Sequence, residues 1–147
     1  MNHDQTTRPM ALPGAQKDNE FAKFRKVIKM SKNGLELIAD ERHRQIEQER
    51  YSLEHDDNEK PGALTTAAIC YATMAASGPE MRQAIRHQAE HGIPPKHWPW
   101  ELSSWKPGED DSNKSRIREL VKAGALIAAE IDRLQRQVIP APPAITE

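Results

Sequence analysis

A dense polar block between residues 40 and 57 is the part of the chain best equipped for chemistry. It opens with the run DERHRQ at 40–45 and closes with EHDD at 54–57. The first run continues a helical repeat of apolar residues, so Arg42 and Glu49 stand where a buried stripe should go on. Because chains break their own hydrophobic pattern mainly at functional or strained positions, the block predicts a binding or catalytic site.

Carboxylates are the first chemical resource of this block. Glu41, Gln45 and Glu49 recur every four residues and therefore share one face of a helix. Several carboxylates on one helix hold a hard cation such as Mg²⁺ through oxygen ligands and waters. The predicted Mg²⁺ ligands are the carboxylates Glu41, Glu49, Glu54, Asp56 and Asp57. The predicted catalytic residues are Glu41, Glu49, Asp56 and Asp57, with a metal-bound water attacking a nucleotide phosphate. The alternative is a solvated helix face with i,i+4 ion pairs.

The EHDD run at 54–57 places three carboxylates and an imidazole in four consecutive positions. Packing them together is costly unless a cation or a basic side chain lies beside them. A bound metal ion would relieve this cost, and so would anchoring of the loop on Arg42 or Arg44. The alternative interpretation is an exposed acidic turn.

A tryptophan-rich loop is the second resource. Trp98, Trp100 and Trp105 fall within eight residues, among prolines and next to Lys106. Aromatic faces beside a lysine are typical of a platform on which nucleobases stack. Alternatively, the rings cover the open end of a small helical bundle and enlarge its core. The two interpretations are compatible, since different tryptophans can serve each purpose.

Cationic side chains complete the predicted site. Arg44 and Lys122 are the cations that we expect to stabilise phosphate charge. Lys122 stands among alanines, and its alternative is an exposed lysine whose stem covers apolar surface. The predicted ligand-binding residues are Arg44, Gln45, His55, Trp98, Trp100, Trp105, Lys106 and Lys122.

His87 and His91 match the H-x-x-E-H zinc pattern. Proteases that carry this pattern need a larger fold and a further distal ligand. We therefore interpret the pair as a coincidence on an exposed helix.

The elements that must position these residues are helical. Apolar residues at helical spacing predict a region over 20–50 with a break near 31–34, and further helices over 63–77, 80–91 and 114–138. Residues 51–62 and 92–112 are predicted loops, and no stretch alternates long enough for a strand. The predicted fold is an all-α small bundle of three to four core helices with a Trp- and Pro-rich loop. The predicted organisation is a flexible arm over 1–19, one domain over 20–138 and a Pro-rich tail over 139–147.

The last helix carries apolar residues at the a and d spacing of a helix-packing seam. They include Ile117, Leu120, Gly124, Ile127, Ile131, Leu134 and Val138. Such a helix, together with the small-residue helix over 63–77, offers more apolar surface than one small chain buries. A homo-oligomer is therefore expected.

Composition excludes several classes of partner. The chain has 147 residues, 21 basic and 22 acidic side chains, and a net charge of −1, which gives no basic footprint for duplex DNA. No apolar run reaches the length of a membrane span, so no membrane association is expected. The single cysteine, Cys70, precludes an intrachain disulfide and favours a reducing cytoplasm.

Three separated motifs occur in order along the chain. They are ERxRQI at 41–46 with EHDD at 54–57, WPW at 98–100 with WKP at 105–107, and LVKAGALIxAEIDRL at 120–134. Together they resemble a set of small proteins encoded by tailed phages and prophages, over about residues 35–134. The chain departs from that pattern at Arg50, where we expect a glycine. The resemblance implies that the protein acts in the cytoplasm of a bacterial host.

A weaker similarity is to the all-α nucleoside-triphosphate pyrophosphohydrolases of the MazG type. That family places carboxylates of adjacent helices around Mg²⁺ and substrate phosphates, although its E-E-x-x-E motif does not occur here. The similarity implies a Mg²⁺-dependent nucleotide pyrophosphohydrolase. Two alternatives are a non-enzymatic phage protein that sequesters a nucleotide signal or binds a host defence protein, and a structural or interaction module.

Overall fold

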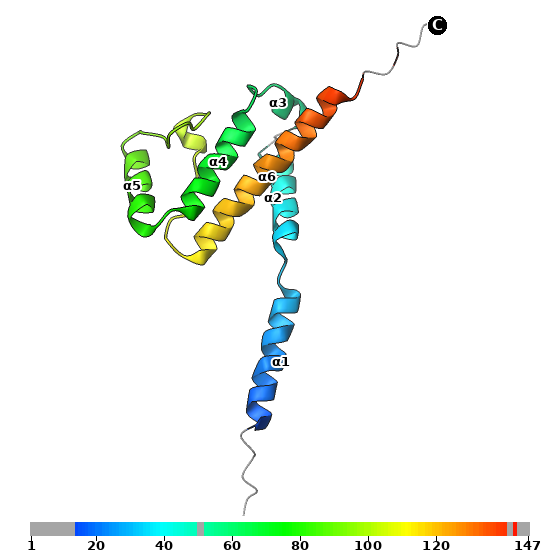
Figure 1. The fold of residues 1–147 in the computed structure, drawn as a ribbon, viewed down its shortest axis with the longest axis vertical. Coiled ribbons are helices and arrows are strands. Elements are labelled where there is room, and N and C mark those ends of the chain that lie inside the picture. The colour runs from blue at the N-terminus through cyan, green and yellow to red at the C-terminus, as the bar shows by residue number, and fades with distance from the viewer. Residues whose placement is uncertain (1–13, 50–51, 141–142, 144–147) are drawn as a thin grey trace, which may run out of the picture. The chain divides into compact units, whose positions relative to one another are not determined.

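The computed structural model describes residues 14–49, 52–140 and 143 (Figure 1). All regular structure in this part of the chain is helical, which confirms the predicted all-α class. By its internal contacts the chain divides into two compact units, residues 1–33 and 34–147. This division falls inside the single domain that the sequence predicted over 20–138.

The first unit contains helix α1, Gly14–Met30. The helix begins within the segment expected to be a flexible arm, and residues 1–13 of that arm lie outside the described residues. Its apolar residues recur at helical spacing and are all more than half exposed. They are Phe21, Phe24, Val27 and Ile28. Residues 31–33 are non-helical, as the predicted break near 31–34 required.

The second unit holds the remaining helices. They are α2 (Gly34–Gln48), α3 (Leu53–Asp57), α4 (Ala63–Ala76), α5 (Pro79–Glu90), the 3₁₀ turn η1 (Leu102–Ser104) and α6 (Asn113–Val138). Gly62 precedes α4 with a φ of +81°, a left-handed conformation that glycine adopts without strain. None of the helices in the described ranges is long and apolar enough to cross a bilayer.

Helix α3 lies inside the predicted loop over 51–62. The hydroxyl of Ser52 accepts a hydrogen bond from the amide of His55, which caps the first turn of the helix. A helix of five residues is too short to show a hydrophobic period, so the sequence pattern gave no sign of it.

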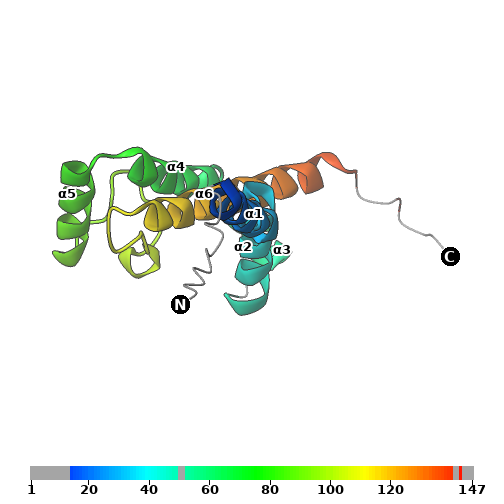
Figure 2. The same ribbon diagram turned by 90° about the horizontal axis from the view of Figure 1, so that it is seen from below.

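The core forms between α4, α6 and the tryptophan loop. Helix α4 runs alongside α6 in both views (Figures 1 and 2), and small residues such as Ala67 and Ala129 allow the two backbones to approach closely. Trp98 and Trp105 are buried in this core, in contact with each other and with the ring of Tyr71. These two tryptophans therefore cover the bundle, whereas Trp100 is only partly buried.

Helix α2 crosses α6 on a different side from α4 (Figure 2). The crossing is close at Gly124, where a β-carbon would come within 2.6 Å of the Cδ1 atom of Ile38. The absence of a side chain at Gly124 thus leaves room for the side chain of Ile38.

A buried ion pair ties the far end of the bundle together. The guanidinium of Arg82, from α5, is fully buried and donates to both carboxylate oxygens of Glu119, at 2.6 and 2.9 Å. Its other hydrogen bonds reach the carbonyl oxygens of Met74 and Asp110 and the carboxylate of Asp111. One side chain therefore joins α5, the end of α4, the loop before α6, and α6 itself.

Replacing Arg82 with methionine should lower the free energy of unfolding by about 3–5 kcal/mol, because the Glu119 carboxylate would remain buried without a cation to pair with. Denaturant unfolding followed by circular dichroism measures the change. Arg86→Met is the matched control: Arg86 also contacts Asp111, but on the surface. It should cost less than about 1 kcal/mol. Equal losses in the two variants would contradict the role given to Arg82.

Candidate functional site

Part of the polar block of α2 is buried, including Arg42 as its place on the predicted stripe required, but the apolar stripe residues Leu35 and Ile46 are exposed. Glu41, Arg42 and Gln45 are each less than a tenth exposed. Their positions on successive turns direct them toward α6, α3 and the tryptophan loop. Each of these polar groups must then find a partner inside the protein or in a ligand.

Arg42 anchors α3. Its Nη2 atom lies 2.6 Å from the Oδ2 atom of Asp56, and both side chains are buried. Of the two ways in which the sequence could relieve the crowding of the EHDD run, the fold uses anchoring on an arginine. Asp57, at the end of the same run, pairs on the surface with Arg136 of α6, whose hydrogen bonds lower the pKa of the Asp57 carboxyl.

Glu41 joins α2 to α6. Its carboxylate accepts hydrogen bonds from Arg44 at 2.8 and 2.9 Å and from Arg118 of α6 at 2.5 Å. Burial by itself would raise the pKa of Glu41, but the hydrogen bonds and charges of the two arginines outweigh it and lower the pKa to about 2. Arg44 also pairs with Glu49 at 2.8 Å, which completes a chain of alternating charges.

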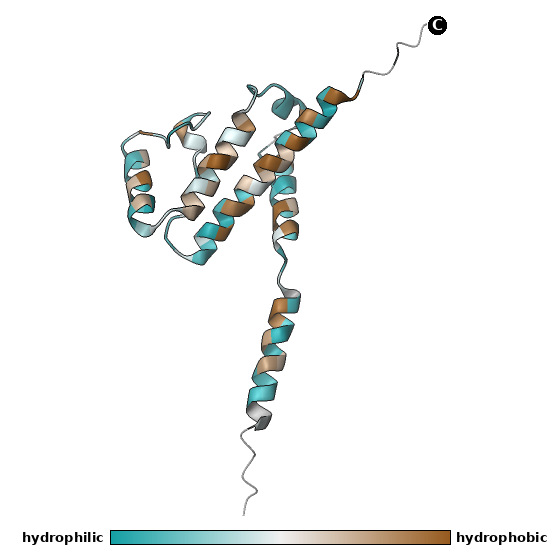
Figure 3. Cartoon of the chain, viewed as in Figure 1, coloured by the Kyte–Doolittle hydropathy of each residue, from teal (hydrophilic) through white to brown (hydrophobic). Residues whose placement is uncertain are grey.

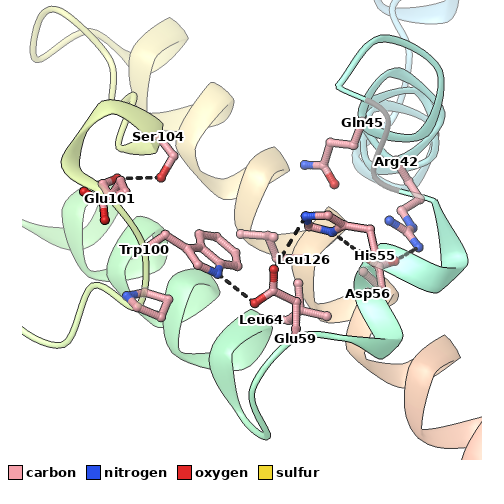
Figure 4. A pocket seen from close by; sticks show the side chains of 12 residues that line it. Arg42, Gln45, His55, Asp56, Glu59, Leu64, Trp100, Glu101, Ser104 and Leu126 are labelled. Carbon is pink, nitrogen blue, oxygen red and sulfur yellow. Dashed lines mark hydrogen bonds and ion pairs between the residues drawn. The ribbon is translucent and has the colours of Figure 1, made fainter.

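A pocket of about 530 Å³ opens between α2, α3 and the tryptophan loop (Figure 4). Its polar wall contains His55 and Glu59, whose Nε2 and Oε1 atoms are 3.7 Å apart. The indole N–H of Trp100 donates to Glu59 at 2.9 Å, which fixes the ring at the edge of the pocket. Leu64 and Leu126 supply apolar surface. We call this space the larger pocket; its volume is in the usual range for small-molecule sites.

A second space of about 150 Å³, the smaller pocket, adjoins the first. The two share the lining residues Gln45, Trp100, Ser104 and Leu126. The smaller pocket is charged, with three cations and two carboxylates in its lining: Arg44, Lys106, Lys122, Glu41 and Glu49. The larger pocket therefore combines apolar side chains with polar and charged ones, and the smaller pocket combines aromatic rings with an excess of positive charge.

Gln45 lies at the junction of the two pockets. Its side-chain nitrogen is 3.3 Å from a carboxylate oxygen of Glu41, but its Oε1 atom is buried and has no hydrogen-bond partner among the described residues. The Nε atom of Arg42, in the lining of the larger pocket, is likewise buried without a partner in the described part of the chain. Buried polar atoms of this kind cost stability unless a water or a ligand satisfies them.

Lys122 is held at the inner side of the smaller pocket. Its ammonium donates to the carbonyl oxygen of Lys106 at 2.5 Å and stands 5.3 Å from the ring centre of Tyr71. Burial lowers the pKa of Lys122 to about 8, and the charge of Arg118 contributes in the same direction. An anion beside this ammonium would offset the desolvation that lowers its pKa.

The fold gathers most of the predicted site residues, but in two places. Eight of them line the smaller pocket: Glu41, Arg44, Gln45, Glu49, Trp98, Trp100, Lys106 and Lys122. Gln45 and Trp100 also line the larger pocket, together with His55 and Asp56. Three predicted residues lie elsewhere: Glu54 is exposed on α3, Asp57 pairs with Arg136 on the surface, and Trp105 is part of the core.

The five predicted Mg²⁺ ligands are not brought into one cluster. Glu41, Glu49, Asp56 and Asp57 are each paired with an arginine, and Glu54 is exposed. Across residues 14–49, 52–140 and 143, no group of three or more His, Cys, Asp or Glu side chains is arranged to hold a metal ion. His87 and His91 are both exposed on and just after α5.

Several residues of the site were not among the predicted ones. Glu59 positions Trp100, and Ser104 and Leu126 line both pockets. Arg118 lines neither pocket but holds Glu41. No local pattern marks them, because each becomes part of the site only when the tryptophan loop and α6 come together. Leu126 is one of many apolar residues of α6, and it differs from the others in that its side chain lines both pockets.

Comparison of the chain with protein-family models, with curated proteins and with solved structures gave no match. The resemblance to phage-encoded proteins and the similarity to MazG-type enzymes therefore stay predictions. The functional argument has to come from the geometry of the two pockets.

Glu41→Gln should lower the free energy of unfolding by about 1–3 kcal/mol at pH 7, because two arginines lose a buried carboxylate. The pKa of Glu41 is lowered from 4.5 to about 2, so its contribution is fully present above pH 4.5 and disappears as pH falls through 2. Denaturant unfolding of both proteins from pH 7 to pH 2 should show the two stabilities converging. Glu54→Gln, on an exposed side chain, is the control and should leave stability within about 0.5 kcal/mol. A constant difference across that pH range would contradict the assignment.

Proposed function

We propose that the two pockets bind one nucleotide or nucleotide-like molecule, with its base in the larger pocket and a phosphate in the smaller one. The observation that carries this proposal is the unpartnered Oε1 atom of Gln45, buried between Trp100 and the cationic lining. A ligand hydroxyl or N–H would satisfy this acceptor. The ring of Trp100 offers a stacking face in the way that base-binding proteins use aromatic residues.

The smaller pocket suits a single phosphate group. About 150 Å³ is the space of roughly five water molecules. Lys122 and Arg44 are the cations that would face the phosphate, and Arg44 would exchange the partly exposed carboxylate of Glu49 for it. This space favours a nucleoside monophosphate or a cyclic nucleotide over a triphosphate.

The charge pairing supports sequestration of the ligand over Mg²⁺-dependent hydrolysis. Carboxylates serve as Mg²⁺ ligands when their oxygens are available, but here arginines already neutralise Glu41, Glu49 and Asp56. Rearrangement of those ion pairs would be needed before a metal-bound water could form. Binding of a ligand without hydrolysis does not require these ion pairs to rearrange.

Thermal unfolding in the presence of nucleoside monophosphates, nucleoside triphosphates and cyclic nucleotides tests the proposal, each with Mg²⁺ and with EDTA. A ligand at 100 times its Kd should stabilise the protein by about 2.7 kcal/mol, equally in both buffers. A shift that requires Mg²⁺, accompanied by product release, would replace this proposal with the pyrophosphohydrolase. No shift with any nucleotide would leave a protein-binding or structural role.

Gln45→Leu separates binding from stability. Removal of an unsatisfied buried acceptor should leave the free energy of unfolding unchanged or higher. The same change should weaken binding of the nucleotide found in the panel by about tenfold or more, as calorimetric titration measures.

Lys122→Met should weaken binding of a phosphate-bearing ligand more than binding of the corresponding nucleoside. Lys96→Met, on an exposed lysine outside both pockets, is the control and should bind as the unchanged protein does.

A further inference from the structure

The turn between α3 and α4 puts a carboxylate into the wall of the larger pocket. Glu59 stands in this turn, two residues after the end of α3, and its amide donates to the carbonyl oxygen of Asp56 at 3.2 Å. Figure 3 shows the end of α3 and this turn as a hydrophilic segment of the second unit. The side chain of Glu59 is 16% exposed, so the backbone turn holds a largely covered carboxylate at the pocket.

The two carboxylate oxygens of Glu59 are used unequally. Oε2 accepts the indole N–H of Trp100 at 2.9 Å, whereas Oε1 lies 3.7 Å from the Nε2 atom of His55, which is beyond hydrogen-bond distance. Figure 4 shows the carboxylate between these two rings. A carboxylate has about four acceptor positions. Glu59 therefore holds Trp100 with one of them and keeps acceptor capacity for a ligand.

Carboxylates outnumber cations in the larger pocket. Its described lining holds the carboxylates of Asp56, Glu59 and Glu101, and its one guanidinium, that of Arg42, is already paired with Asp56. The buried atoms of this lining without a hydrogen-bond partner among the described residues are one acceptor, the Oε1 atom of Gln45, and one donor, the Nε atom of Arg42. The excess of negative charge favours a ligand edge that presents N–H groups over one that presents lone pairs.

The place of Glu59 beside Trp100 decides which part of a base it would meet. An indole N–H bond lies in the plane of the ring, so the carboxylate that accepts it stands at the edge of the ring. A base stacked on the face of Trp100 would bring one of its own edges next to this carboxylate. The edge by which proteins read an unpaired base is chiefly the Watson–Crick edge.

Among the four bases of RNA, guanine alone carries two adjacent N–H groups on this edge, a ring N–H and an exocyclic amino group. A carboxylate can accept both, and such charge-assisted hydrogen bonds are stronger than neutral ones. Adenine has a lone pair at the position of the ring N–H of guanine, and a carboxylate repels it. We infer that the larger pocket selects a guanine base and that Glu59 determines this specificity. The inference rests on the proposed nucleotide-binding function and narrows its ligand to a guanine nucleotide.

Calorimetric titration of the full chain with GMP, IMP and AMP tests the preference, with cyclic GMP and cyclic AMP titrated in parallel. IMP keeps the ring N–H of guanine and lacks its amino group, so the three monophosphates differ only at the Watson–Crick edge. GMP should bind at least about tenfold more tightly than AMP, with IMP between them, because each N–H removed costs a hydrogen bond to a charged group.

Equal affinities for the guanine and adenine forms would overturn the inference and leave the proposed nucleotide site standing. Binding of none of the five compounds would overturn the proposed function, and this inference with it.

Glu59→Gln separates recognition of the base from support of Trp100. The glutamine carbonyl can still accept the indole N–H, but the side chain has lost its charge and one acceptor oxygen. The variant should weaken GMP binding about tenfold and leave AMP binding within about twofold, so that the preference for guanine largely disappears. An equal loss for GMP and AMP would show that Glu59 only positions Trp100, and would overturn the inference.

Glu54→Gln is the matched control, because Glu54 is an exposed carboxylate of α3 outside both pockets. It should bind GMP and AMP with the affinities of the unchanged protein. Far-UV circular dichroism and thermal unfolding without ligand should agree among the three proteins, which shows that both variants fold. A loss of guanine preference in Glu54→Gln as large as in Glu59→Gln would attribute the effect to net charge and overturn the role given to Glu59.

Discussion

The buried pair of Arg82 and Glu119 is the interaction on which the arrangement of the second unit depends. A guanidinium removed from water is stable only where its donors find acceptors, and the acceptors here come from α4, α6 and the loop residues Asp110 and Asp111. Satisfying that one side chain fixes where the loop ends and α6 begins. The same loop carries the tryptophans of the site. The ion pair therefore helps to hold these side chains in place.

A similar constraint shapes the site itself. The buried stripe of α2 carries charged residues, and each is compensated by a charge from another element: Asp56 of α3 for Arg42, and Arg118 of α6 for Glu41. The pairing holds three helices around a cavity and also removes the carboxylates from competition for a metal ion. Two buried polar atoms of the lining have no hydrogen-bond partner among the described residues: the amide oxygen of Gln45, close to Trp100 and the cations, and the Nε atom of Arg42. Such a lining is suited to binding an anionic aromatic molecule.

Helix α6 serves the fold with one face and leaves another unused. Alanines and Leu126 pack on α4, while the larger aliphatic residues at its a and d positions face away from the core. Small side chains suit the inner face because α4 approaches closely, and bulky ones would hold the helices apart. The bulky residues therefore stay largely exposed on the described helix.

The sequence by itself determined the helical class, the break before Gly34 and the bounds of α4, α5 and α6 to within two residues, because these depend on local periodicity and on Gly and Pro signals. It also predicted that Arg42 faces the interior, but the apolar residues Leu35 and Ile46 of the same predicted stripe are exposed. Tertiary structure alone decided which charges pair, that Asp57 and Trp105 lie outside the pockets, and which face of α6 is buried. Those outcomes depend on the direction of side chains from segments distant in the chain, and spacing along one helix does not contain that information.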